Sequence, residues 1–109
     1  MPTRSNIEAP AVAVEYASEV RKRLGDHIRR IILFGSQARG DARAGSDYDF
    51  IVVVDDRRRD LREGIADVAD RLLDSRDALC ASIIYSDAEW RRVRQSPLGW
   101  NVLREGIVL

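Results

Sequence analysis

The chain has 109 residues, in which 18 lysines and arginines balance 18 aspartates and glutamates. A net charge of zero provides no broad field to attract nucleic acid or an anionic membrane, so direct nucleic-acid binding is not expected. The length fits a single domain over residues 1–109. The core of so small a domain is thin, so self-association and binding of a partner chain both stay open.

Cysteine usage and hydropathy predict a cytoplasmic protein. The single cysteine, Cys80, cannot form an intrachain disulfide, and its apolar surroundings predict a small core residue. No run approaches the ~18 apolar residues of a membrane helix, and the first residues lack the apolar core of a signal peptide. We therefore expect no association with a membrane.

The first half of the chain predicts a helix, a strand, a short helix and a second strand. Residues 8–24 carry an apolar side chain at every fourth position, which is typical of a surface helix. Residues 28–34 form a short run rich in β-branched side chains and bounded by glycines, which predicts a buried strand. A polar, glycine-containing stretch then leaves room for one short helix. Residues 50–54 are apolar on both faces, as in a central strand covered on each side.

The second half predicts further helices around one more strand. Residues 57–74 carry one apolar stripe on a charged helix, with Arg57 to Arg59 as its solvated start. Residues 78–85 form a third strand candidate. Two helices are then expected, one opened by a capping box at Ser86 and one running from Pro97 to Gly106. This order predicts an α/β (α+β) fold, a small mixed β-sheet with helices packed on it.

The polar stretch between the first two strands begins with a candidate phosphate-binding turn. Gly35 and Ser36 directly follow the first strand. A glycine lets a phosphate approach the backbone, and the Ser36 hydroxyl is a donor. If a helical turn begins at Ser36, its N–H groups point at the same place. Arg39 is a candidate for a further phosphate contact or, equally, an exposed arginine.

The second strand begins with a candidate metal-binding pair. Asp47 and Asp49 are two residues apart, so both project from one face of the strand. Two carboxylates, with other positions left to water and phosphate oxygens, are typical of a Mg²⁺ site. The alternative interpretation gives Gly35 a turn role, makes Ser36 an N-cap and leaves the aspartates as polar residues at a strand start.

The motif resembles that of a known family. The stretch from Leu33 to Val54, LFGSQARGDARAGSDYDFIVVV, resembles the core motif of the DNA polymerase β nucleotidyltransferase superfamily, in its minimal nucleotidyltransferase branch. The lead-in GDHIRRIILFGS and the ending NVLREGIVL extend this likeness over nearly the whole chain. Small members are often paired with a helical HEPN partner in toxin–antitoxin systems, and some adenylylate that partner.

The resemblance implies a polymerase β-type fold and roles for the motif residues. Gly35 and Ser36, with Arg39, would bind the nucleotide phosphates, while Asp47 and Asp49 would be catalytic and hold Mg²⁺, with two ions when the NTP is bound. In active members a third acidic residue on a later strand completes the site and acts as the base. Aligning residues 78–86 with that strand puts Ser82 at the position. A missing base typically slows a reaction by roughly 10²–10⁴-fold but does not prevent binding of ATP or another NTP. Nucleotide binding is therefore the firmer prediction, and nucleotidyl transfer the less certain one.

Two functions remain after this comparison, with a weaker third. In the first, the chain would be a Mg²⁺-dependent enzyme that transfers AMP from ATP to a hydroxyl of a HEPN-type toxin or another acceptor. Alternatively, it is a weak or inactive antitoxin that neutralises a partner by contact, for which a tryptophan such as Trp100 would be a suitable anchor. A drug-modifying adenylyltransferase is less suitable, since such enzymes usually need a further domain for the acceptor.

Overall fold

The computed structural model describes residues 9–40, 47–55 and 59–109. The predicted helix start at Glu8 and the arginines Arg57 and Arg58 lie outside these ranges. The elements in chain order are α1 (Ala11–Leu24), the 3-10 turn η2 (Gly25–His27), β1 (Ile28–Phe34), α2 (Ser36–Arg39), β2 (Tyr48–Val54), α3 (Arg59–Arg76), β3 (Cys80–Ser86), α4 (Asp87–Val93), α5 (Pro97–Glu105) and β4 (Ile107–Val108).

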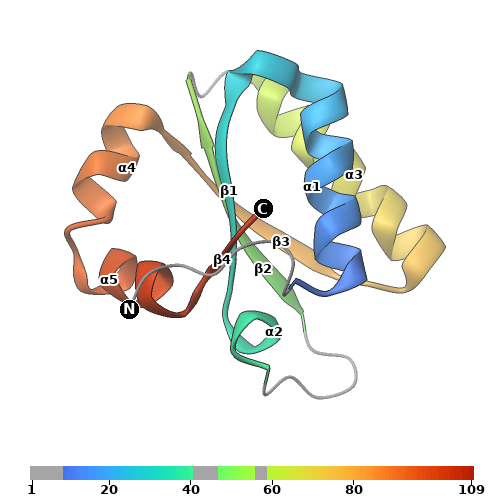
Figure 1. The fold of residues 1–109 in the computed structure, drawn as a ribbon. Helices are drawn as coiled ribbons and strands as arrows, with labels where there is room; N and C mark the ends of the chain where they lie inside the picture. The colour runs from blue at the N-terminus through green and yellow to red at the C-terminus, as the bar shows by residue number, and fades with distance from the viewer. Residues whose placement is uncertain (1–8, 41–46, 56–58) are drawn as a thin grey trace.

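The strands form one mixed sheet in the order β3-β2-β1-β4. Strand β1 is antiparallel to both β2 and β4, whereas β2 and β3 are parallel. Helices α1 and α3 lie side by side on one side of the sheet, and α4 and α5 lie on the other (Figure 1). The predicted α/β fold with a small mixed sheet is therefore confirmed.

The two central strands bury side chains on both of their faces, as their continuous apolar runs predict. In β2, Phe50 and Val52 pack into the core beneath α1 and α3, while Ile51 and Val53 pack with Trp90 of α4. All five residues from Phe50 to Val54 are buried. This alternation assigns each β2 side chain to one of two helix layers, including the polar residues at the start of the strand.

Helices α4 and α5 begin at the serines that the sequence predicts as their N-caps. The Ser86 hydroxyl accepts a hydrogen bond from the Glu89 N–H, and the Glu89 carboxylate accepts one from the Ser86 N–H. The Ser96 hydroxyl caps α5 by accepting one hydrogen bond, from the Gly99 N–H, and Pro97 lies in the first turn. Strand β4 was not expected, because its two residues carry too little pattern to predict pairing with β1.

The single cysteine and the two tryptophans differ in their burial. Cys80 is buried, and burial raises the pKa of its thiol to about 11, which agrees with a core residue. Trp90 is buried as well, whereas Trp100 is 58% exposed.

In the described part of the chain, no helix combines the length and apolarity that a membrane span requires.

Candidate functional site

Asp47 and Asp49 meet at the first residues of β2. Asp47 directly precedes the strand, and Asp49 is its second residue. Strand alternation puts Asp49 on the same face as Ile51 and Val53, the side covered by α4 and α5. Burial raises the pKa of the Asp49 carboxyl above its usual range, and the negative charge of Asp47 raises it further. The two carboxylates therefore repel each other.

Gly35 lies against the Asp49 carboxylate from the side of β1. Phe34 is paired with Asp49 in the antiparallel ladder, so the next residue along β1 passes over the Asp49 side chain. A Cβ atom on Gly35 would lie 2.6 Å from Asp49 Oδ2, and Gly35 has φ 77° and ψ −160°, a region that only glycine readily adopts. The predicted phosphate-binding turn and the predicted metal pair are thus one site.

Ser36 and Arg39 are the first and last residues of the single-turn helix α2. This helix lies at the end of the sheet where β1 ends and β2 begins (Figure 1). Gly35 rather than Ser36 is the N-cap, and its carbonyl accepts hydrogen bonds from the N–H groups of Ala38 and Arg39. Arg39 is exposed and its Nη1 lies 3.5 Å from Glu105 Oε2. Both interpretations of Arg39, phosphate contact and exposed arginine, are compatible with this position.

The placement of Ser82 at the third acidic position is wrong. In the parallel ladder Asp49 pairs with Ala81, and Ser82 pairs with Phe50. Paired residues of adjacent strands point to the same face, so Ser82 faces the layer of α1 and α3, away from the aspartates. There its hydroxyl is hydrogen-bonded to the hydroxyl of Tyr16, whose ring stacks on Phe50. The position beside Asp49 belongs to Ala81.

The side of β3 that flanks Asp49 is apolar and open. Ala81 and Ile83 are exposed on this face, as is Leu79 just before the strand. The register therefore leaves Asp49 without a carboxylate neighbour on β3. Among the residues that the structure describes, no three histidine, cysteine, aspartate or glutamate side chains gather closely enough to hold a metal ion by themselves. Any ion at Asp47 and Asp49 would need further ligands from nucleotide or water.

The opposite flank of the site opens into a cleft that sequence reasoning missed. A cavity of about 450 Å³ extends from Gly35 and Arg39 to the helix α5, where Asn101, Arg104 and Glu105 line it. No local signal marks these α5 residues, because α5 lies far from the motif in the sequence. The packing of Val102 on the sheet and the pairing of β4 with β1 bring the end of α5 to this place.

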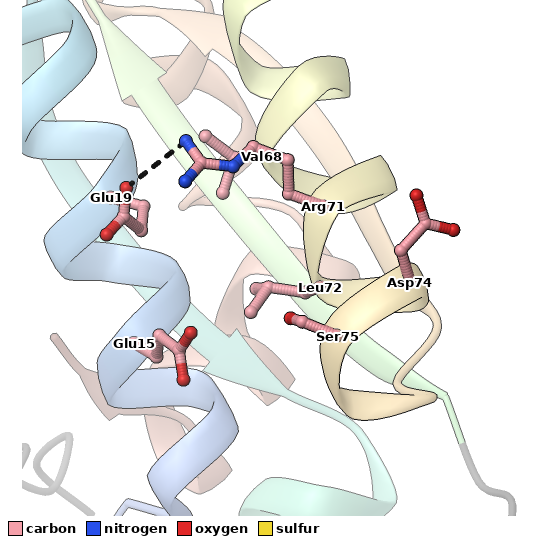
Figure 2. A pocket seen from close by; sticks show the side chains of 7 residues that line it. All are labelled: Glu15, Glu19, Val68, Arg71, Leu72, Asp74 and Ser75. Carbon is pink, nitrogen blue, oxygen red and sulfur yellow. Dashed lines mark ion pairs between the residues drawn. The ribbon is translucent and has the colours of Figure 1, made fainter.

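A second groove lies between α1 and α3, on the face of the sheet away from the aspartates. Its volume is about 350 Å³, and Figure 2 shows Glu19 facing Arg71 across it. This pair is 3.7 Å apart, and Glu15 pairs with Arg76 at 2.6 Å. The charged groups thus join two helices over the buried Val68 and Leu72, as expected of a structural contact between helices.

Comparison with known proteins identifies the family of the chain. Residues 14–97 match the family model described as a nucleotidyltransferase domain. The chain is 33% identical over 95 residues to a "Putative protein adenylyltransferase" of Methanocaldococcus jannaschii, covering 87% of this chain and 91% of that protein.

Solved structures share the fold. A "putative nucleotidyltransferase" of Sulfolobus solfataricus matches with a TM-score of 0.57 and 19% identity over 89% of this chain and 75% of the other. A "toxin-antitoxin with AMP-PNP" matches with a TM-score of 0.56 and 21% identity over 86% of this chain and 68% of the other. The chain belongs to the nucleotidyltransferase domain family, and the predicted likeness to a minimal nucleotidyltransferase domain is confirmed.

Proposed function

We propose that this domain binds Mg²⁺ and ATP at Asp47 and Asp49 and transfers AMP to a hydroxyl group of a partner protein, a HEPN-type toxin. The observation that carries the proposal is the contact of the Gly35 backbone with the Asp49 carboxylate. It joins a turn open to phosphate with a pair of carboxylates, and a nucleotidyl transfer needs both. The relative named as a protein adenylyltransferase and the toxin–antitoxin structures support the acceptor class.

The residues fit a divalent cation bound together with a nucleotide. Two hard carboxylate oxygens from one strand face are suitable Mg²⁺ ligands. Burial is the main reason that the pKa of Asp49 is raised, and the charge of Asp47 adds a repulsion that a cation would relieve. The absence of a Cβ on Gly35 lets the backbone of the predicted phosphate-binding turn lie directly against the Asp49 carboxylate. When bound, the ion would offset the charge that develops on the phosphoryl group.

The remaining residues would position the substrate for an in-line displacement. The Ser36 hydroxyl would donate a hydrogen bond to a phosphate oxygen, and Arg39 would add a positive charge at the phosphate end. The acceptor oxygen would form a bond to the α-phosphorus as the bond to the β-phosphate oxygen breaks, and pyrophosphate would leave. The hydroxyl proton would pass to water, since Ala81 provides no acceptor.

A non-catalytic antitoxin is the second candidate function. Two observations favour it: Asp49 has Ala81 as its neighbour on β3, and Trp100 is exposed on α5. The lost base would slow transfer by roughly 10²–10⁴-fold without preventing nucleotide binding. On this alternative the partner is neutralised by contact, and an exposed tryptophan is a residue type suited to an interface anchor.

Co-expression of the chain with a candidate HEPN-type partner provides the sample that separates the two functions. The purified pair is incubated with Mg²⁺ and either α-labelled or γ-labelled ATP. Nucleotidyl transfer predicts that only the α-label becomes attached to the partner and that Ser36→Ala with Asp47→Asn removes it. If the doubly substituted protein still protects cells at unchanged protein levels, neutralisation does not depend on catalysis.

A further inference from the structure

The cleft beside Gly35 contains two arginines that share one carboxylate. Glu105 Oε2 lies 3.5 Å from Arg39 Nη1, and Glu105 Oε1 accepts a hydrogen bond from Arg104 Nη2 at 3.2 Å. Arg39 belongs to α2 and the other two residues to α5, so the carboxylate connects the motif to the last helix. The three side chains together carry one net positive charge on the wall of this cleft.

The Arg104 side chain is oriented by a second contact. Its guanidinium carbon lies 4.5 Å from the centroid of the Trp100 ring, a cation–π geometry that restricts where the group can point. An arginine held in this way loses less side-chain entropy when it binds an oxyanion. Arg104 therefore has the properties of a prepared anion contact.

We propose that Arg104 is a second phosphate-binding arginine of this site and that Glu105 holds Arg39 and Arg104 until the terminal phosphates of an NTP displace it. Because the role requires a triphosphate bound at Asp47 and Asp49, it rests on the function proposed above. The ligand class is an inorganic or nucleoside polyphosphate. Displacement is inexpensive, since all three side chains are 32–43% exposed and their ion pairs are weakened by water.

The position of the cleft indicates which end of the nucleotide it receives. Gly35 continues from β1, which borders β2 on one side, whereas Ala81 lies on β3, which borders β2 on the other. An acceptor hydroxyl and the leaving pyrophosphate must lie on opposite sides of the α-phosphorus in an in-line displacement. The exposed face of β3 is available to the acceptor, on one side of β2. The cleft beside β1, on the other side, would therefore hold the phosphates.

Calorimetry with three ligands tests this assignment on the 109-residue chain. Arg104→Gln is expected to weaken binding of tripolyphosphate and of Mg²⁺–ATP by roughly tenfold, while leaving AMP binding unchanged. Glu105→Gln is expected to strengthen tripolyphosphate binding by roughly two- to fivefold, since the competing carboxylate is gone. Arg91→Gln removes an exposed arginine of α4 outside the cleft, so it should change neither the tripolyphosphate affinity nor the Mg²⁺–ATP affinity.

Three results would overturn the proposal. Unchanged tripolyphosphate affinity in a folded Arg104→Gln protein removes its role, and an equal loss of AMP affinity assigns the cleft to the nucleoside end. Weaker tripolyphosphate binding in Glu105→Gln removes the role of the carboxylate. The double variant Asp47→Asn with Asp49→Asn is measured alongside, because retained Mg²⁺-dependent ATP affinity there refutes the proposed function, whereas the tripolyphosphate series without Mg²⁺ still decides the role of Arg104.

Discussion

The backbone of Gly35 lies directly against the carboxylate of Asp49, with room for no Cβ atom: one added there would be 2.6 Å from Oδ2. Gly35→Ala should therefore push the carboxylate aside and strain a backbone at φ 77°. We expect a loss of about 1–3 kcal/mol in the free energy of unfolding and loss of Mg²⁺-dependent ATP affinity. Urea denaturation and calorimetry measure the two effects.

Gly40 provides the matched control for this substitution. It also has a positive φ, 82°, but a Cβ there would meet nothing within 4 Å. Gly40→Ala should cost about 1 kcal/mol of stability through its backbone and keep the ATP affinity. If both variants lose ATP binding equally, the contact between Gly35 and Asp49 has no special role.

Asp49→Asn should separate stability from function. Burial and the charge of Asp47 raise the pKa of Asp49, so its ionised form destabilises the ligand-free protein at neutral pH. The variant should have a higher Tm at pH 7 but no Mg²⁺-dependent ATP affinity. Since a raised folded-state pKa means that the native protein gains stability as pH falls through it, the advantage of the variant should shrink on acidification. A lower Tm for the variant at pH 7 would contradict this account of the site.

Ala81→Asp should raise nucleotidyl transfer if the missing base limits the rate. The side chain at position 81 is exposed on the face of Asp49, so a carboxylate there would be solvated and near the acceptor. A gain toward the roughly 10²- to 10⁴-fold contribution of a general base is expected with α-labelled ATP and the partner.

Ser82→Asp is the control for position, because it adds the same group one residue away. Its carboxylate would face Tyr16 and the core beneath α1 and α3, so a loss of roughly 1–3 kcal/mol in stability and no gain in transfer are expected. A greater rate in Ser82→Asp than in Ala81→Asp would refute the observed register.

The two tryptophans should differ in what they stabilise. Trp90 is 5% exposed and Trp100 is 58% exposed. Trp90→Ala should cost about 3–5 kcal/mol of folding stability, whereas Trp100→Ala should stay within about 0.5 kcal/mol of wild type. If Trp100 is an interface anchor, its replacement should weaken the complex with the partner by about 2 kcal/mol or more. A pull-down with unchanged affinity in Trp100→Ala would exclude it as an anchor.

Local patterns were sufficient for the elements that carry the motif. The apolar runs of β1 and β2 and the capping box at Ser86 depend on neighbouring residues, so their sequence predicts them well. The joining of Gly35 to Asp49 was also foreseeable, because one loop connects the two strands. The structure adds the close contact that makes them one site.

The sequence-based predictions were wrong or incomplete where the position of a residue depends on pairing between strands that are far apart in the sequence. The residues of β3 are apolar on both faces, so no alternation in the sequence indicates which way Ser82 points, and only the register with β2 assigns it to Tyr16. Likewise, the cleft residue Arg104 reaches the motif because α5 packs on the sheet and β4 pairs with β1. Such contacts follow from the assembled sheet rather than from periodicity.

The most direct test of the central claim is the Mg²⁺ dependence of ATP binding, measured by calorimetry for the wild type and for the double variant Asp47→Asn with Asp49→Asn. The account predicts that Mg²⁺ strengthens ATP binding to the wild type and that this increment is absent from the folded variant. An increment of equal size in both proteins would contradict the assignment of these two carboxylates to the metal.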